Sequence, residues 1–152
     1  MTPALWSFLS LAGRIGMSAI FLIAGVGKIQ NWSGTAAHME AAGIPAASLL
    51  LPLTVVAEIG GGLALLVGWQ TRWAAVGLFL FLIPATLIFH HFWDLPDPEQ
   101  SMQRIHFLKN LAIMGGLLEF SAMGAGGFSL DALSAKSALA LPSFAPKSQQ
   151  PA

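Results

Sequence analysis

The segment Phe107–Phe120, FLKNLAIMGGLLEF, decides the fold class of this chain. Nearly all of its residues are apolar, yet Lys109 and Asn110 stand side by side near one end and Glu119 near the other. A charge at the centre of a lipid bilayer costs at least about 2.5–3.5 kcal/mol, so such residues face the interior of a helix bundle. A membrane helix of this composition therefore predicts polar partners at matching depths on other helices.

The composition of the whole chain supports a membrane location. Of its 152 residues, 55% are hydrophobic and only 9% are charged, whereas soluble domains carry about a quarter charged residues. We therefore expect the lipid bilayer to be the solvent over most of the surface. The formal net charge is zero, so nothing indicates a nucleic-acid partner. The chain has no cysteine, which excludes disulfide, thiol-redox and cysteine–zinc chemistry by the chain itself.

Along the whole chain, four stretches have the roughly 20 mostly apolar residues that a membrane-crossing helix needs, and Phe107–Phe120 lies in the last of them. They predict an all-α membrane protein built as a four-transmembrane-helix bundle, in a domain over residues 1–128. The predicted spans are approximately residues 5–27, 46–69, 73–93 and 105–123. The connection Asn31–Pro45 is either a short interfacial helix or a plain loop. Residues 129–152 are Ser-, Ala-, Pro- and Gln-rich and predict a flexible C-terminal tail, in which 129–131 could begin one last short helix.

Four spans place both termini on one side of the membrane. That side carries Arg72, Lys136 and Lys147, and the opposite side carries Lys28 and Arg104. Cytoplasmic segments are enriched in lysine and arginine. The side with the termini has one more lysine or arginine than the opposite side, which predicts cytoplasmic termini.

Helical rise gives the depth of each buried charge. At ~1.5 Å per residue, Arg14 on the first span and Glu58 on the second reach similar levels in a core of ~30 Å. We therefore predict a buried Arg14–Glu58 ion pair, with Glu119 as a second acid facing Arg14. Such a pair either fixes only the helix register or belongs to a functional site.

The same estimate gathers a second polar group at the outer side. It combines Lys28, one of His90 and His91, Lys109 and Asn110. Adjacent helical residues point about 100° apart, so only one of the two histidines can face the bundle. An ammonium beside an amide needs acceptors, which a bound carbonyl ligand would supply. The alternatives are an end-of-helix Lys28 that reaches the headgroups, ordinary interfacial histidines, and a haem or metal site formed by the two histidines with His106.

Four segments carry a resemblance to a known family: GVGKIQNW (Gly25–Trp32), VVAEIGGGLALLVGWQTRWAA (Val55–Ala75), FHHFW (Phe89–Trp93) and IHFLKNLAIMGGLL (Ile105–Leu118). Together they resemble the DoxX family of small bacterial membrane proteins, over nearly all of residues 5–120. The resemblance implies a four-helix inner-membrane bundle and favours His90 over His91. The positions that match its motifs are Arg14, Lys28, Glu58, His90, Lys109 and Asn110.

The family takes its name from a subunit of a thiosulfate:quinone oxidoreductase. The resemblance thus implies an accessory to a quinone-linked redox complex concerned with sulfur or oxidative stress, with a quinone as cofactor and a redox partner protein. Lys109 or His90 would then hydrogen-bond a quinone carbonyl, and His90 could transfer the proton. The alternative is a non-enzymatic scaffold or small-solute transport module, with or without homo-oligomers, in which the buried charges are structural locks.

Overall fold

The computed structural model describes residues 2–140, and all of the regular secondary structure in that range is helical. The all-α class is thereby confirmed. The helices are α1 (Pro3–Gln30), α2 (Trp32–Ala41), α3 (Ala47–Val67), α4 (Thr71–Phe89), α5 (Glu99–Met123) and α6 (Leu130–Ala140).

Local sequence signals set the ends of the long helices. Thr2 caps α1 by accepting a hydrogen bond from the Leu5 amide at 3.3 Å, and Pro3 occupies the first helical position, where its missing N–H costs nothing. α3 ends at Gly68, whose φ of +69° lies in the left-handed region. Glycine adopts this conformation without a steric penalty. The chain therefore turns sharply between α3 and α4.

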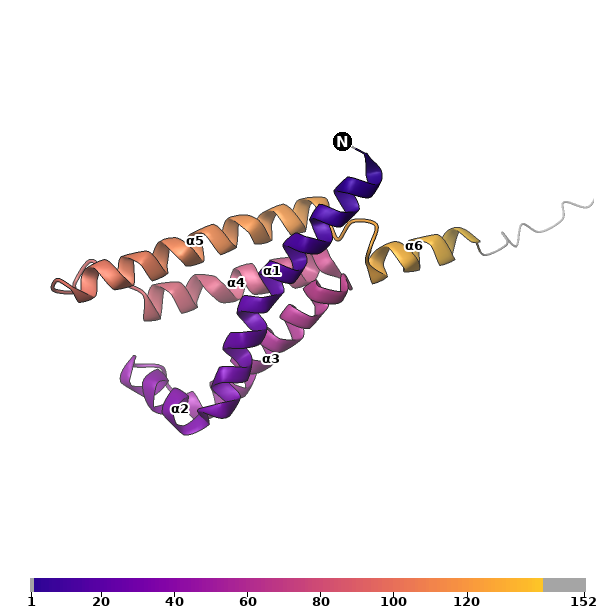
Figure 1. Cartoon of the computed structure of the whole chain (residues 1–152). Coiled ribbons are helices and arrows are strands. Elements are labelled where there is room, and N and C mark those ends of the chain that lie inside the picture. The colour runs from indigo at the N-terminus through magenta and orange to yellow at the C-terminus, as the bar shows by residue number, and fades with distance from the viewer. Residues whose placement is uncertain (1, 141–152) are drawn as a thin grey trace, which may run out of the picture.

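The helices form two pairs that diverge from one end of the molecule (Figure 1). α1 packs along α3 and α4 packs along α5, while α3 and α4 meet at their connecting turn. The two pairs form a V, and we call its closed end, around the turn at residues 68–70, the vertex. A buried cluster that includes Phe21, Leu65, Leu78 and Leu117 joins the two pairs there. α2 lies at the open end, where Met39 packs with residues of α3.

Within residues 2–140, three helices are long and apolar enough to cross a membrane, namely α1, α3 and α4. Each contains most of a predicted span. The predicted span at 105–123 is helical but forms the last part of α5, which begins earlier, at Glu99. α5 is less apolar because it also carries Arg104, Lys109 and Glu119.

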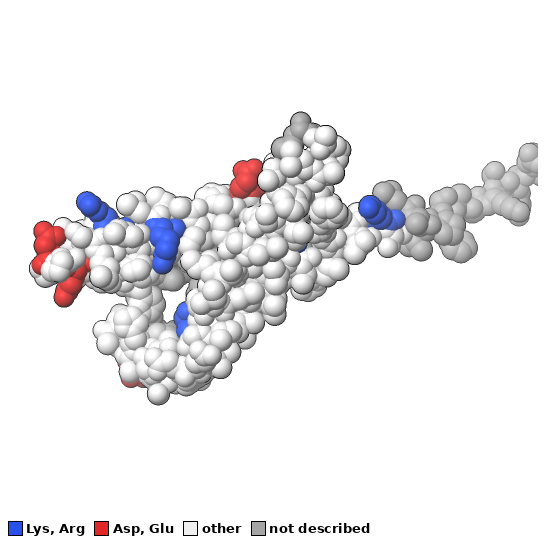
Figure 2. Space-filling view, in the orientation of Figure 1, with Lys and Arg blue, Asp and Glu red and all other residues white. Residues whose placement is uncertain are grey.

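The outer surface is apolar, as a lipid environment requires. Ile23 and Leu49 are each 73% exposed and Val56 is 68% exposed. Charged side chains cover little of the face in Figure 2, and some of the Lys and Arg atoms lie in the notch between the two helix pairs.

The segments outside the long helices also contain helices. Residues 32–41 are helical, which agrees with the interfacial-helix alternative. The predicted tail, residues 129–152, begins with α6 at 130–140, the short helix that residues 129–131 are expected to begin. Asp131 docks on the vertex, with its amide donating to the Gly68 carbonyl at 2.8 Å. Residues 141–152 of the predicted tail lie outside the described residues.

Candidate functional site

Glu58 forms an ion pair with Lys28. The Lys28 Nζ lies 2.8 Å from both carboxylate oxygens of Glu58. The Glu58 side chain is 7% exposed and that of Lys28 26% exposed. The predicted Arg14–Glu58 ion pair is therefore wrong. The partner of Glu58 does come from α1, as predicted, but it is Lys28.

The register between α1 and α3 explains the error. A Cβ added to Gly25 would lie 2.6 Å from Ile59 Cγ1 and 3.4 Å from Glu58 Cβ, so Glu58 is level with Gly25. Arg14 is eleven residues earlier on α1, about 16 Å along the axis at ~1.5 Å per residue. The depth estimate assumed that each span starts at the membrane edge, whereas close packing at Gly25 sets the actual register.

Arg14 is completely buried at the vertex and pairs with backbone carbonyls. Its Nη1 donates to Leu65 O at 3.3 Å and to Leu66 O at 3.0 Å, and its Nη2 donates to Phe128 O. A Cβ on Gly68 would collide with the guanidinium, so this position needs glycine for space as well as for its positive φ. Glu119 is exposed, and the prediction that it faces Arg14 is wrong.

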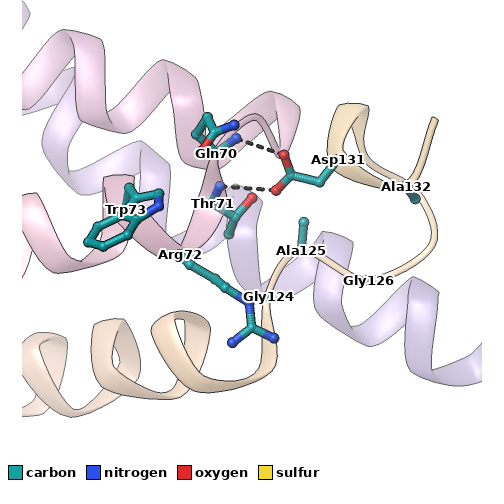
Figure 3. A pocket seen from close by; sticks show the side chains of 9 residues that line it. All are labelled: Gln70, Thr71, Arg72, Trp73, Gly124, Ala125, Gly126, Asp131 and Ala132. Atoms are coloured by element: carbon teal, nitrogen blue, oxygen red, sulfur yellow. Dashed lines mark hydrogen bonds between the residues drawn. The ribbon is translucent and has the colours of Figure 1, made fainter. Parts of the chain in front are cut away.

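Asp131 is a vertex residue that the sequence reasoning did not identify. Its carboxylate accepts hydrogen bonds from the amides of Gln70, at 2.7 Å, and Thr71, at 3.0 Å, and so caps the start of α4 (Figure 3). The signal was Ser129 two residues earlier, whose hydroxyl accepts from the Ala132 amide at 3.1 Å in a helix-capping arrangement. A pocket of about 330 Å³ lies beside this contact.

A larger cavity of about 810 Å³ lies between the two helix pairs towards the open end. Lys28, His90, Lys109 and Asn110, the four residues of the predicted outer group, all line it, together with Glu58. Most of its other lining is apolar or aromatic, including Phe21, Ile20, Phe81, Leu82, Phe89 and Ile113. Ligand sites typically have volumes of about 300–1,000 Å³ and a few polar groups in an apolar lining.

Asn110 and His90 are held in place by neighbouring side chains. Asn110 is 8% exposed, and its Nδ2 donates to Thr86 Oγ1 at 3.0 Å. His90 Nδ1 lies 2.8 Å from Gln103 Oε1, an acceptor, so the ring nitrogen donates. The ring also stacks on His106 with centroids 5.2 Å apart. Both polar groups are therefore positioned before any ligand enters.

Lys109 and His38 are further polar residues of the cavity lining, which also includes Thr35 and Thr54. Lys109 Nζ donates to His106 Nδ1 at 3.3 Å. His38, which the sequence reasoning did not select, comes from α2 and stacks on Phe89 with centroids 5.2 Å apart. His91 does not line the cavity and bonds to the Ile88 carbonyl. Among the described residues no group of three or more His, Asp or Glu side chains could hold a metal ion.

The fold and cavity define a helical protein whose described part has three apolar helices of membrane-spanning length and a polar cluster inside an apolar cavity. The sequence model of the DoxX family matches residues 9–91, and that of the SURF4 family matches residues 52–136. The chain belongs to the DoxX family.

Several curated proteins are similar in sequence. Inner membrane protein YqjF of Escherichia coli is 38% identical over 81% of this chain and 89% of its own length. Inner membrane protein YphA of the same organism is 32% identical over 81% of this chain and 88% of its own length. A Surfeit locus protein 4 homolog of Schizosaccharomyces pombe is 29% identical over 82% of this chain but only 37% of its own length. No solved structure matches the chain.

Proposed function

We propose that this protein is an integral protein of the bacterial inner membrane that binds a quinone in the cavity between its helix pairs, as an accessory to a quinone-linked redox complex. The observation that carries the proposal is the combination of Lys109, Asn110 and His90 with an apolar cavity of about 810 Å³. The family membership and the names of the two Escherichia coli relatives support the location.

The proposal includes α5 as a fourth membrane span. Asn110 is buried and Lys109 lines the cavity, so the polar part of this helix turns away from lipid at one level. Exposed Leu108, Leu111 and Leu118 supply an apolar outer face. With four spans both termini share one side, and the excess of lysine and arginine on that side favours the cytoplasm.

The cavity matches the chemistry of a quinone. A quinone ring is flat and apolar with carbonyl oxygens at its edge, and these oxygens accept hydrogen bonds. The cavity offers donors in the Lys109 ammonium and, when both of its ring nitrogens carry a proton, in His90, whose Nδ1 donates to Gln103; the aromatic side chains of Phe81 and Phe89 lie in the same lining. A bound quinone would supply the redox chemistry, whereas these side chains would orient the ring and bring a proton-carrying group, His90, to its edge.

A redox role also requires a second protein. The chain has no cysteine and no tyrosine, so it has no thiol or phenol that could exchange electrons with the quinone. The electrons therefore come from, or go to, a partner protein bound to this one.

The non-enzymatic alternative rests on a different observation. Arg14 is completely buried and joins α1 to the end of α3 and to the segment before α6 through carbonyl groups. This is the geometry of a structural lock, and it lies at the vertex, away from the cavity. A scaffold or solute-transport module with the same lock would have no specific requirement for His90 or Lys109 at the cavity.

Equilibrium binding of 1,4-naphthoquinone to the protein in lipid nanodiscs tests the proposal, with lipid-only nanodiscs as the reference for partitioning. One hydrogen bond contributes about 0.5–1.5 kcal/mol, so His90→Ala and Lys109→Ala should each weaken binding about two- to tenfold. His91→Ala is the matched control, because His91 adjoins His90 but does not line the cavity. Wild-type affinity in both cavity variants, or no binding by the wild type, would exclude this site.

A further inference from the structure

The charges that line the cavity do not balance. Two lysines, Lys28 and Lys109, and one carboxylate, Glu58, contribute formal charges to it, which leaves one positive charge in excess. Both oxygens of Glu58 are taken by Lys28. Within residues 2–137 no carboxylate oxygen lies within 4.0 Å of Lys109 Nζ.

The contacts of Lys109 leave hydrogen-bonding capacity. Its one side-chain partner among the described residues is the imidazole of His106, at 3.3 Å. An ammonium has three N–H donors, so a neutral ring nitrogen satisfies one of them. Glu119, the next acid along α5, is ten residues away, about 15 Å at ~1.5 Å per residue. The helix therefore offers this lysine no counter-charge of its own.

Lys109 is an exposed residue in the lining of a largely apolar cavity, and in such surroundings an anion is its best partner. Water screens a charge strongly, whereas the low dielectric of a membrane protein leaves the attraction between opposite charges large. The Lys109 ammonium makes a charge-assisted hydrogen bond to any acceptor, which is roughly twice as strong as a bond between neutral groups, and only an anionic ligand adds the attraction of opposite charges. Glu58 does not repel an anion here, because Lys28 neutralises it.

We propose that the cavity prefers ligands that carry an ionised oxygen on a flat apolar ring, with Lys109 as the residue that selects the anion. The chemical class is an acidic hydroxyquinone in its deprotonated form. The aromatic side chains Phe21, Phe81 and Phe89 in the lining favour a ring over an alkyl chain. This inference rests on the proposed quinone site and names the charge state of the ligand that the site takes.

Two ligands of nearly the same shape test the inference. The protein in nanodiscs is titrated at neutral pH with 1,4-naphthoquinone, which is neutral, and with 2-hydroxy-1,4-naphthoquinone, which is ionised. We expect the wild type to bind the anion about tenfold more tightly than the neutral compound after correction for partitioning into lipid-only nanodiscs. Lys109→Gln keeps a neutral donor, so it should lose most of this preference while its affinity for the neutral quinone changes less than about threefold.

The controls separate charge selection from other effects. Lys109→Arg keeps the charge and should keep the preference. Lys136→Gln removes an exposed lysine of α6 outside the cavity lining and should also keep it. Should Lys109→Gln fail to fold, the comparison of the two ligands on the wild type still tests the anion preference, and Lys109→Met replaces Lys109→Gln as the test of the assignment to Lys109.

The possible outcomes distinguish the inference from the function on which it rests. Equal affinity for both ligands in the wild type overturns the anion preference but leaves a quinone site. Retention of the preference in Lys109→Gln overturns the assignment to Lys109. Absence of binding by both ligands overturns the quinone site and, with it, this inference.

Discussion

Replacement of Arg14 by methionine tests whether a single buried guanidinium holds the vertex together. Arg14 Nη1 donates to two carbonyls near the end of α3, at 3.3 and 3.0 Å, and Nη2 donates to Phe128 O. Methionine has a similar length and no donor. The variant therefore removes the three hydrogen bonds without opening a large cavity.

The expected loss follows from the carbonyl groups left behind. Leu65 O keeps a second donor, the Gly68 amide at 3.2 Å, so Leu66 O and Phe128 O are the two that lose their partner. A fully buried polar group without a partner costs about 1–3 kcal/mol, and because both of these contacts are only partly buried, the lower end of that range applies. Removal of the charge also relieves the penalty for burying it. We therefore expect the free energy of unfolding to fall by about 2–4 kcal/mol, towards the lower part of the summed cost.

Equilibrium unfolding in mixed micelles of a mild detergent and dodecyl sulfate measures this change, with the fluorescence of the five tryptophans as the signal. Arg72→Met is the matched control. Arg72 Nη1 also donates to two carbonyls at the vertex, at 3.1 and 2.7 Å, but this side chain is exposed. Water can replace an exposed donor, so the control should lose less than about 1 kcal/mol. Equal losses in the two variants would refute the claim that burial gives Arg14 its effect.

Three further predictions concern the packing, the ion pair and the cap. Gly25→Val should destabilise the α1–α3 contact by about 1–3 kcal/mol, measured by the same unfolding assay, because its Cβ would lie 2.6 Å from Ile59 Cγ1; an unchanged stability would contradict the close approach. Lys28→Met should cost about 3–5 kcal/mol because it leaves the carboxylate of Glu58 buried and unpaired, and the double variant with Glu58→Met should recover most of that loss; no recovery would mean that the pair is not the source of the effect. Asp131→Ala should cost about 0.5–2 kcal/mol and speed hydrogen exchange at the two amides that begin α4, and unchanged exchange there would exclude the cap.

Much of the fold follows from the sequence because hydropathy and length are local properties. The apolar runs that predicted the first three spans lie within, or largely within, α1, α3 and α4, which are long and apolar enough to cross a membrane. The polar character of Lys109 and Asn110 also predicted where α5 faces the cavity. Neither conclusion needed knowledge of which helix packs on which.

The pairing of charges could not be predicted in the same way. Lys28 and Arg14 lie on the same helix, and the choice between them as the partner of Glu58 depends on an axial shift of about 16 Å at ~1.5 Å per residue. Close packing of Gly25 against Ile59 sets that shift, and a depth estimate from span ends does not contain it. The partners of Arg14 could not be predicted for another reason. They are backbone carbonyls, which every sequence has, so no residue type indicates them.

The sequence by itself determined a helical, lipid-facing chain with a small set of polar residues that need partners inside it, because the cost of charge in an apolar medium depends only on residue type and span length. The tertiary structure decided which polar residues meet. Lys28 pairs with Glu58, Arg14 donates to backbone carbonyls at the vertex, and Asp131 caps α4. These contacts form because helix register and the turn at Gly68 bring together residues that are far apart in the chain.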